Sequence, residues 1–312
     1  MTIQEAYKQL LLQLYEVYDD REAANIADLV IEHVTNQRRI DRIVNKQMPV
    51  SPAQLNQIEQ HAQQLLKHKP IQYVLNEAWF AGMQLYVDEN VLIPRPETEE
   101  LVSWITESQF EVSSLKFKVT GADDNRIPLT ILDIGTGSGC MPIALKKKFS
   151  GWDVHAIDIS ASALEVAKKN ALSQRTDVAF QLLDILDESS WQQLPMFDII
   201  VSNPPYILEK EAATMHANVL RFEPHTALFV PDVDALLFYR NIADFALLHL
   251  RENGLLFFEI NESLGNDVCE MLAAKGFGDI ELRRDLQGKD RMVKVVLDRK
   301  KYNPFLIPFT IL

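Results

Sequence analysis

At residues 133–139 the chain reads Asp133-Ile134-Gly135-Thr136-Gly137-Ser138-Gly139. Apolar residues from Leu129 to Ile134 predict a strand before the glycines, and the spacing of Cys140 to Phe149 predicts a helix after them. Glycine lets a backbone turn sharply and approach a ligand closely. The G-x-G-x-G spacing differs from the dinucleotide fingerprint, and no Gly-Lys-Ser/Thr phosphate loop follows. The stretch therefore predicts a ligand-binding turn between a strand and a helix.

Strands and helices continue to alternate after this turn. The patterns predict strands at Val154–Ile157, Val178–Leu183, Phe197–Val201 and Leu255–Ile260, and helices at Ala161–Leu172, Val233–Leu250 and Leu264–Lys275. A final antiparallel hairpin is predicted from Gly278–Arg284 and Met292–Leu297. Alternation of this kind is typical of a parallel sheet covered by helices on both faces. We therefore expect an α/β domain over residues 96–298.

Residues 1–70 predict a separate helical bundle. This segment contains no glycine, its apolar residues repeat at helical spacing, and Ser51-Pro52-Ala53-Gln54 has the pattern of a capped helix start. Residues 71–95 are aromatic and β-branched and predict a β-hairpin linker, with a turn at Asp88-Glu89-Asn90.

Two further segments, one polar and one apolar, lie outside these predicted domains. Residues 112–128 are polar and predict a surface insertion, and residues 299–312 predict an apolar C-terminal tail.

Acidic residues end the predicted strands next to the glycines. Asp158 follows about twenty residues later, where a carboxylate accepts hydrogen bonds from ribose hydroxyls; it also suits a helix cap together with Ser160. Asp184 or its neighbour Ile185 is expected to meet an adenine, and Asp133 to hold an ammonium directly or through water. Acids on both sides disfavour a phosphorylated ligand. They suit a ligand with two hydroxyls, an ammonium and a sulfonium, which is S-adenosylmethionine.

The motif Asn203-Pro204-Pro205-Tyr206 follows the strand at Phe197–Val201. Ligands of open parallel sheets bind beyond the carboxyl ends of strands. The Asn203 side-chain oxygen and the Pro204 carbonyl could both accept hydrogen bonds from one –NH₂ group, and Tyr206 could offer a flat face to a planar substrate. Positioning of an amide or ring-bound amino nitrogen against a methyl donor needs no further nucleophile. A plain proline-rich turn is the alternative.

Composition narrows the function classes. The formal net charge is −13, with 31 Lys and Arg against 44 Asp and Glu, which disfavours broad or stable nucleic-acid binding. The sequence contains no run of 18 or more apolar residues, so no membrane span is predicted. The N-terminus does not resemble a signal peptide. Two cysteines, Cys140 and Cys269, favour the cytoplasm. None of the seven histidines has metal-ligand spacing, so no metal site is predicted.

Several segments together resemble the PrmC/HemK family of release-factor glutamine methyltransferases. They are Pro70-Ile71-Gln72-Tyr73, Leu92 to Glu99, Ile131 to Cys140, Asp158-Ile159-Ser160, Ser202 to Ile207, Phe222-Glu223-Pro224 and Asp290-Arg291. The resemblance implies a five-helix N-terminal domain that docks the protein substrate, followed by a Rossmann-like seven-stranded methyltransferase domain. It also implies methylation of the N5 nitrogen of the glutamine in the Gly-Gly-Gln motif of class 1 peptide chain release factors.

The resemblance assigns residues as well. It implies that Gly135 to Gly139 and Asp158 bind S-adenosylmethionine, that Asn203 to Tyr206 bind the glutamine, and that Asn203 also lies near the cofactor. Ile185 stands where an aromatic residue often contacts adenine, and Asn261-Glu262 stands where a glycine is expected. A glutamine methyltransferase of a ribosomal protein, and an amino-methyltransferase of DNA or RNA bases, remain as alternatives.

Overall fold

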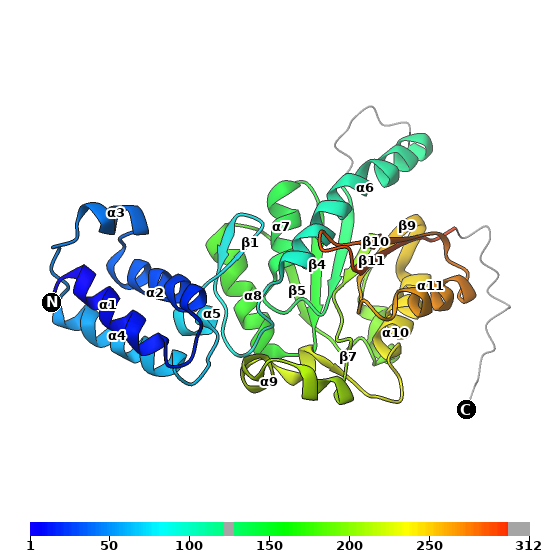
Figure 1. Cartoon of the computed structure of the whole chain (residues 1–312). Helices are drawn as coiled ribbons and strands as arrows, with labels where there is room; N and C mark the ends of the chain where they lie inside the picture. Colours follow the sequence, from blue (N-terminus) through cyan, green and yellow to red (C-terminus); the bar gives the residue numbers. More distant parts are fainter. Residues whose placement is uncertain (121–127, 299–312) are drawn as a thin grey trace. The chain divides into compact units, whose positions relative to one another are not determined.

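The computed structural model describes residues 1–120 and 128–298, with the side chains of 109–120, 214 and 217 left out (Figure 1). The chain divides into two compact units. The first contains Met1–Glu77 with the short segments Val87–Glu89 and Met215–Glu223, and the second contains the described remainder. The predicted tail at 299–312 lies outside the described residues.

The first unit is a helical bundle. Residues 1–77, all of which the structure describes, form five helices, at α1 Ile3–Leu14, α2 Asp20–Thr35, α3 Arg39–Val44, α4 Pro52–Leu65 and α5 Ile71–Leu75. Its core is made of the apolar face of α1, α2 and α4, with Leu10, Val30 and Ala62 almost fully buried. Ser51 caps α4 and exchanges hydrogen bonds with Gln54, which confirms the predicted capping box.

A short hairpin begins the second unit. Strands β1 (Ala78–Phe80) and β2 (Met83–Leu85) pair antiparallel. Their turn is at Ala81-Gly82, where both residues have positive φ, and the expectation of a turn at Asp88-Glu89-Asn90 was wrong for this hairpin. A two-residue turn with positive φ matches the twist of the flanking strands, which explains the choice of Gly82.

The seven-stranded sheet has the order β10-β11-β9-β6-β3-β4-β5. Its strands are β3 Thr130–Ile134, β4 Asp153–Asp158, β5 Ala179–Leu182, β6 Phe197–Ser202, β9 Leu250–Glu259, β10 Gly278–Arg284 and β11 Asp290–Val296. Strand β11 runs antiparallel to both of its neighbours, and the other neighbouring pairs are parallel. The predicted α/β class, with a mixed seven-stranded sheet, an N-terminal helical region and a hairpin, is confirmed.

Helices cover both faces of this sheet (Figure 1). Side chains alternate along β3: Ile131 packs with α6 (Pro96–Thr120) and α7 (Cys140–Lys148), whereas Leu132 packs with α10 (Leu237–His249) and α11 (Gly265–Ala274). Helix α8 (Ala161–Gln174) contacts α7 and β4. Because both faces are covered, the central strand β6 is buried along its whole length, whereas burial alternates along the edge strand β10.

The remaining elements are short. They are the 3₁₀ helices η1 (Glu188–Gln193), η2 (Glu209–Thr214) and η3 (His225–Ala227), the strand pair β7 (Ile207–Leu208) and β8 (Phe229–Val230), and helix α9 (Ala217–Phe222). No helix among the described residues is both long and apolar enough to cross a lipid bilayer.

Three boundaries differ from expectation by more than two residues. Helix α6 runs to Thr120, so the first half of the predicted insertion at 112–128 is helical, since neither glycine nor proline interrupts it before Gly121. Strand β9 starts at Leu250 rather than Leu255, because Leu250 pairs with Phe197 before the chain loops out through Asn253. Helix α10 starts at Leu237, four residues later than predicted.

The strand order creates a topological switch point, where the connections that follow two neighbouring strands leave in opposite directions. From β3 the chain moves outward to β4 and β5, and it then returns to β6 on the other side of β3. The connections after β3 and β6 therefore leave in opposite directions and open a crevice beyond their carboxyl ends, where ligands of such sheets bind. The glycine turn follows β3, and Asn203 follows β6.

Gly139 offers a test of this packing. It has φ +79°, and a Cβ there would lie 3.0 Å from Ile143 Cδ1 and 3.1 Å from Ala167 Cβ. Gly139→Ala should therefore lose about 1–2 kcal/mol from backbone strain and about 1–3 kcal/mol more from overpacking. Gly288→Ala is the control, because Gly288 has φ +83° but open space around it. Urea denaturation measures both, and equal losses would contradict close packing at Gly139.

Candidate active site

The glycine turn is held against the next strand by its backbone. The amides of Gly135 and Thr136 both donate to the carbonyl of Ile157, at 2.9 and 3.0 Å, and Gly139 N donates to Thr136 O at 2.9 Å. Gly135, Gly137 and Gly139 all have positive φ. A Cβ at Gly135 or Gly137 would meet no atom within 4 Å, so the glycines leave open space at the turn. The backbone is thereby exposed to a ligand that lies over it.

Asp158 ties the turn to the end of β4. One carboxylate oxygen accepts from Gly137 N and the other from Ser160 N, both at 2.8 Å, and Ser160 Oγ caps α8 by accepting from Ala163 N at 3.2 Å. Burial raises the pKa of Asp158, while the backbone hydrogen bonds act in the opposite direction. The helix-cap interpretation therefore holds, and each oxygen keeps a lone pair for a ligand hydroxyl. Its contact with ribose stays a prediction.

Asn170 was not predicted from the sequence, although it holds the same turn. This fully buried residue of α8 donates from Nδ2 to Ser138 O and Tyr86 O, both at 2.9 Å, and accepts from Tyr86 N at 2.7 Å. An asparagine inside a helix pattern usually indicates an exposed polar position, so no pattern would have identified it. It fastens the hairpin end to the glycine turn.

The end of β5 contributes Asp184 and Ile185. Both line the cavity described below. Asp184 Oδ1 accepts from Leu186 N at 2.9 Å, and Ile185 O accepts from Trp191 Nε1 at 3.0 Å, so this turn is fixed by its own hydrogen bonds. Ile185 presents an apolar surface where an aromatic ring was expected from the resemblance. The assignment of either residue to adenine stays a prediction.

Asp133 lies fully buried at the carboxyl end of β3. Within the part of the chain that the structure describes, the two carboxylate oxygens of Asp133 and the hydroxyl of Thr136 have no hydrogen-bond partner. Burial, together with the nearby charge of Asp158, raises the pKa of Asp133 to about 7. A buried carboxylate without partners is unfavourable unless a cation or donor reaches it. This orphaned group fits the ammonium of the expected cofactor.

The Asn203–Tyr206 motif begins directly after β6. Asn203 Nδ2 donates to Thr98 Oγ1 at 3.3 Å, and Ser202 Oγ donates to Ile134 O at 2.7 Å, which joins the ends of β6 and β3. Asn203, Pro204 and Pro205 line the cavity. Tyr206 is not among the lining residues, and its hydroxyl donates to Glu259 Oε1 at 3.2 Å. Its predicted contact with a planar substrate stays a prediction.

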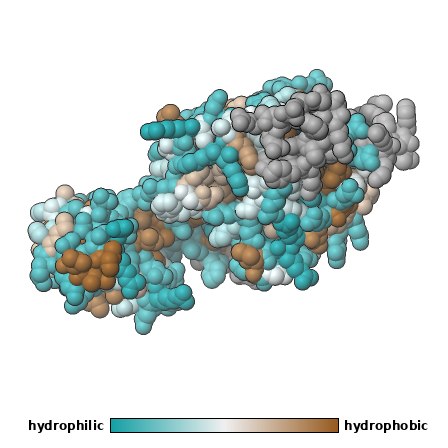
Figure 2. Space-filling view, turned by 90° about the horizontal axis from the view of Figure 1, so that it is seen from above, coloured by the Kyte–Doolittle hydropathy of each residue, from teal (hydrophilic) through white to brown (hydrophobic). Residues whose placement is uncertain are grey.

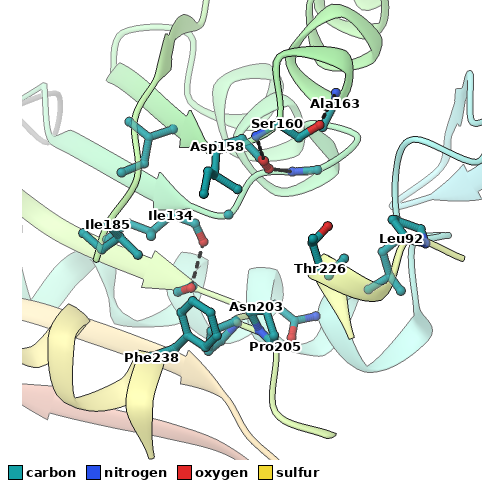
Figure 3. Close-up of a pocket in the computed structure, with 18 of the residues that line it drawn as sticks. Leu92, Ile134, Asp158, Ser160, Ala163, Ile185, Asn203, Pro205, Thr226 and Phe238 are labelled. Atoms are coloured by element: carbon teal, nitrogen blue, oxygen red, sulfur yellow. Dashed lines mark hydrogen bonds between the residues drawn. The ribbon is translucent and has the colours of Figure 1, made fainter. Parts of the chain in front are cut away.

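The glycine turn and the segments that follow β4, β5 and β6 surround one cavity of about 310 Å³, within the range of small-molecule sites (Figure 3). In Figure 3, Asp158 and Ser160 lie on one side of it, and Asn203 and Pro205 on the other. Of the predicted residues, Gly135, Gly137, Asp158, Asp184, Ile185 and Asn203 to Pro205 line it, whereas Asp133, Thr136, Ser138, Gly139 and Tyr206 do not.

Other lining residues were not predicted as site residues. In Figure 3, Leu92 and Thr226 lie on the side of the cavity opposite Ile185, and Phe238 lies on the same side as Asn203 and Pro205. Leu92 belongs to a segment that carried the family resemblance, which was the available signal. Phe238 and Ile242, one turn apart on α10, follow only an ordinary helical pattern, so sequence reasoning had no means to find them.

The cavity is acidic and mostly apolar. Among the described residues that line it, Asp158 and Asp184 are the ionisable ones. Such a surface attracts a cation and disfavours phosphate. Within the described part of the chain, no three His, Cys, Asp or Glu side chains come together as a potential metal site. The arrangement can hold a nucleoside with a positively charged side arm and bring a planar nitrogen to Asn203.

Family models match both parts of the chain. The model described as PrmC N-terminal domain matches residues 5–75, and the model described as methyltransferase small domain matches residues 121–225. Among solved structures, the hMettl16 catalytic domain in complex with MAT2A 3'UTR hairpin 6 has a TM-score of 0.51 at 16% identity, covering 83% of this chain and 85% of that one. That likeness concerns the fold alone.

Full-length relatives are much closer in sequence. The release factor glutamine methyltransferase of Flavobacterium psychrophilum is 43% identical over 295 residues, covering 95% of this chain and 99% of the relative. The protein of the same name from Bacteroides thetaiotaomicron is 38% identical over 280 residues, covering 90% and 95%. Similarity at this level, over nearly the whole length of both chains, means that this chain belongs to the PrmC/HemK family of release factor glutamine methyltransferases.

Proposed function

We propose that the protein transfers a methyl group from S-adenosylmethionine to the side-chain amide nitrogen, N5, of the glutamine in the Gly-Gly-Gln motif of class 1 release factors. One observation carries the proposal: Asn203 and the two prolines line the same cavity as Gly135, Gly137 and Asp158. A cofactor held by the glycine turn would thus lie beside an acceptor for an amide. Family membership supports the choice of substrate. We also propose that the protein works in the cytoplasm, where release factors act.

The residues fit the cofactor in three places. The Asp158 carboxylate would accept from the ribose hydroxyls, since each oxygen has a lone pair beyond its backbone hydrogen bond. The apolar side chain of Ile185 and the Asp184 turn would enclose the adenine. The orphaned carboxylate of Asp133 would balance the ammonium, directly or through water. When bound, the cofactor supplies an electrophilic methyl group on a sulfonium.

Asn203 and Pro204 would prepare the amide for transfer. The lone pair of an amide nitrogen is delocalised into the carbonyl, which makes the nitrogen a poor nucleophile. Acceptors on both of its hydrogens, the Asn203 side-chain oxygen and the Pro204 carbonyl, would aim the nitrogen at the methyl group. In the transfer, the nitrogen would form its bond to the methyl carbon as the sulfur–carbon bond breaks, and the nitrogen would lose one proton to solvent. Alignment of this kind contributes up to roughly 7–11 kcal/mol.

The prolines make this arrangement rigid. Neither Pro204 nor Pro205 has an amide hydrogen, and the ring fixes φ near −65°. The segment therefore offers acceptors but no competing backbone donors at these two positions. Ser202 anchors its start through the hydrogen bond to Ile134.

We further propose the division of labour along the chain. Residues 1–70 dock the protein substrate, 71–95 form the linker, and 96–298 carry out the transfer. A single glutamine offers too little surface for selection, because specific interfaces bury about 1,200–2,000 Å². The first unit exposes large apolar side chains, including Ile40, Ile43 and Val44 on α3, which are 59, 55 and 77% exposed. Figure 2 shows apolar residues gathered on this unit.

Mass spectrometry tests the reaction itself. Release factor, ribosomal protein, total RNA and DNA are incubated in parallel with the enzyme and isotope-labelled cofactor. We expect a methyl group on the Gly-Gly-Gln glutamine. Asn203→Ala should lower turnover by at least about 100-fold through lost alignment, with little change in cofactor affinity. Label confined to another substrate would refute the release factor assignment, and near-normal turnover of Asn203→Ala would refute the alignment role.

Cofactor binding should release a proton at pH 6. Burial raises the pKa of Asp133 to about 7, so the acid is largely protonated at this pH. The ammonium of the cofactor favours the ionised form of Asp133 and so lowers its pKa. The α-amino group of the cofactor is already protonated at pH 6, because this pH lies well below its usual pKa near 8. Calorimetry in two buffers of different ionisation enthalpy counts the protons. Asp133→Asn should bind more weakly and release none; a wild type that releases none would remove Asp133 from the ammonium site.

Substitutions on α3 test the docking role. Ile40→Asp and Val44→Asp should raise KM for intact release factor by about tenfold, since burying a charge against an apolar partner is unfavourable. The cofactor affinity and melting temperature should change little, because both side chains are exposed. Leu172→Asp is the control, since Leu172 is 80% exposed on α8 in the other unit. Unchanged KM in both α3 variants would exclude this surface.

A further inference from the structure

A chain of polar side chains runs from Asn203 to the end of β9. Asn203 Nδ2 donates to Thr98 Oγ1 at 3.3 Å, and Thr98 Oγ1 donates to Glu259 Oε2 at 2.6 Å. Thr98 lies in the first turn of α6, and Glu259 is the last residue of β9. Their exposed fractions are 3% and 1%, so water does not replace these contacts. Segments distant in sequence therefore meet beside Asn203.

The direction of these hydrogen bonds orients the Asn203 carboxamide. An ionised carboxylate only accepts, and a hydroxyl has a single hydrogen to donate. Thr98 uses that hydrogen on Glu259, so it can only accept from its other neighbour. Asn203 must then turn its nitrogen toward Thr98, which leaves the carboxamide oxygen on the opposite side. Without Thr98, the two ends of a carboxamide are almost equal in shape and can exchange.

Orientation matters because Asn203 lines the cavity. The hydrogens of an incoming glutamine amide need an acceptor, and the carboxamide oxygen is the acceptor that Asn203 can offer. A flipped carboxamide would place its own –NH₂ against the –NH₂ of the substrate. Two donors would then face each other, and the substrate nitrogen would lose its alignment with the methyl group.

Glu259 also holds the far end of the motif. Its Oε1 accepts from the Tyr206 hydroxyl at 3.2 Å, and Asn261 Nδ2 donates to the Tyr206 carbonyl at 3.3 Å. Burial raises the pKa of Glu259, whereas the Thr98 and Tyr206 hydrogen bonds and the charge of Arg291 favour its ionised form. Glu259 at the end of β9 and Asn261 just after it thus support both ends of the Asn203–Tyr206 segment, the Asn203 end through Thr98. Asn261, in the place of an expected glycine, is part of this support.

We propose that Thr98 and Glu259 are positioning residues: they fix the Asn203 carboxamide with its oxygen toward the cavity, ready to accept from the substrate amide. The inference rests on the proposed methylation of a glutamine. Neither side chain is among the residues that line the cavity, so both act through Asn203 rather than on the substrate.

Steady-state kinetics of Thr98→Val tests the inference, because valine keeps the shape and removes the hydroxyl. Turnover on release factor should fall by about 10- to 100-fold, while the dissociation constant of the cofactor stays within about twofold. Thr98→Ser should restore most of the turnover. The matched control is Thr106→Val on the same helix, which removes a similarly buried hydroxyl that donates to Ser103 O at 2.7 Å. It should leave turnover unchanged.

A double-substitution cycle separates positioning from general stability. Thr98→Val added to Asn203→Ala should cause no further loss, because the hydroxyl has nothing left to orient. Losses that multiply, or normal turnover of Thr98→Val alone, would overturn the inference. Thr98→Ala replaces the valine variant if melting temperature shows that the latter does not fold. A wild type that transfers no methyl group to release factor would overturn the proposed function and the inference together.

Discussion

The two hydrogen bonds accepted by Asp158 are the interaction on which the site depends. They join the glycine turn after β3 to the start of α8, and thereby hold the ends of β3 and β4 together. The sheet can place ligands there only because β3 and β6 are neighbours whose connections diverge. One carboxylate thus serves the fold and remains available to a ligand. Asp158 is largely buried in order to reach both backbone amides, and this burial raises the pKa of its carboxyl group.

Much of the fold could be predicted from periodicity, because strands buried on both faces are apolar and the helices between them have one apolar face. The order of the strands along the chain, the capped start of α4 and the closing hairpin all followed from such patterns. Boundaries were less accurate where tertiary pairing decides them. Leu250 belongs to β9 because it pairs with Phe197. No local sequence pattern predicts a pairing between residues about fifty positions apart.

The site was partly predictable for a related reason. Residues that end strands, such as Asp158 and Asn203, carry a signal because polar groups directly after apolar runs are unusual. Asn170 and Phe238 carry none, since each lies in a helix with an ordinary pattern, and Thr98 is marked only by the segment Leu92 to Glu99 that carries the family resemblance. Their roles come from contacts between segments far apart in sequence, which only three-dimensional structure supplies. Tyr206 illustrates the reverse case: its hydroxyl is engaged by Glu259, away from the cavity lining.

Strand β11 is the last strand of the described chain, yet it lies between β9 and β10. Until residue 296 has left the ribosome, β9 has an unpaired edge and β10 has no neighbour through which to join the sheet. Unpaired edges invite pairing with other chains, and long-range strand pairing is slow. The end of β9 carries Glu259, whose partner in the sheet is Met292 of β11. The strand end that supports Asn203 therefore gains its second neighbour only after β11 has been synthesised.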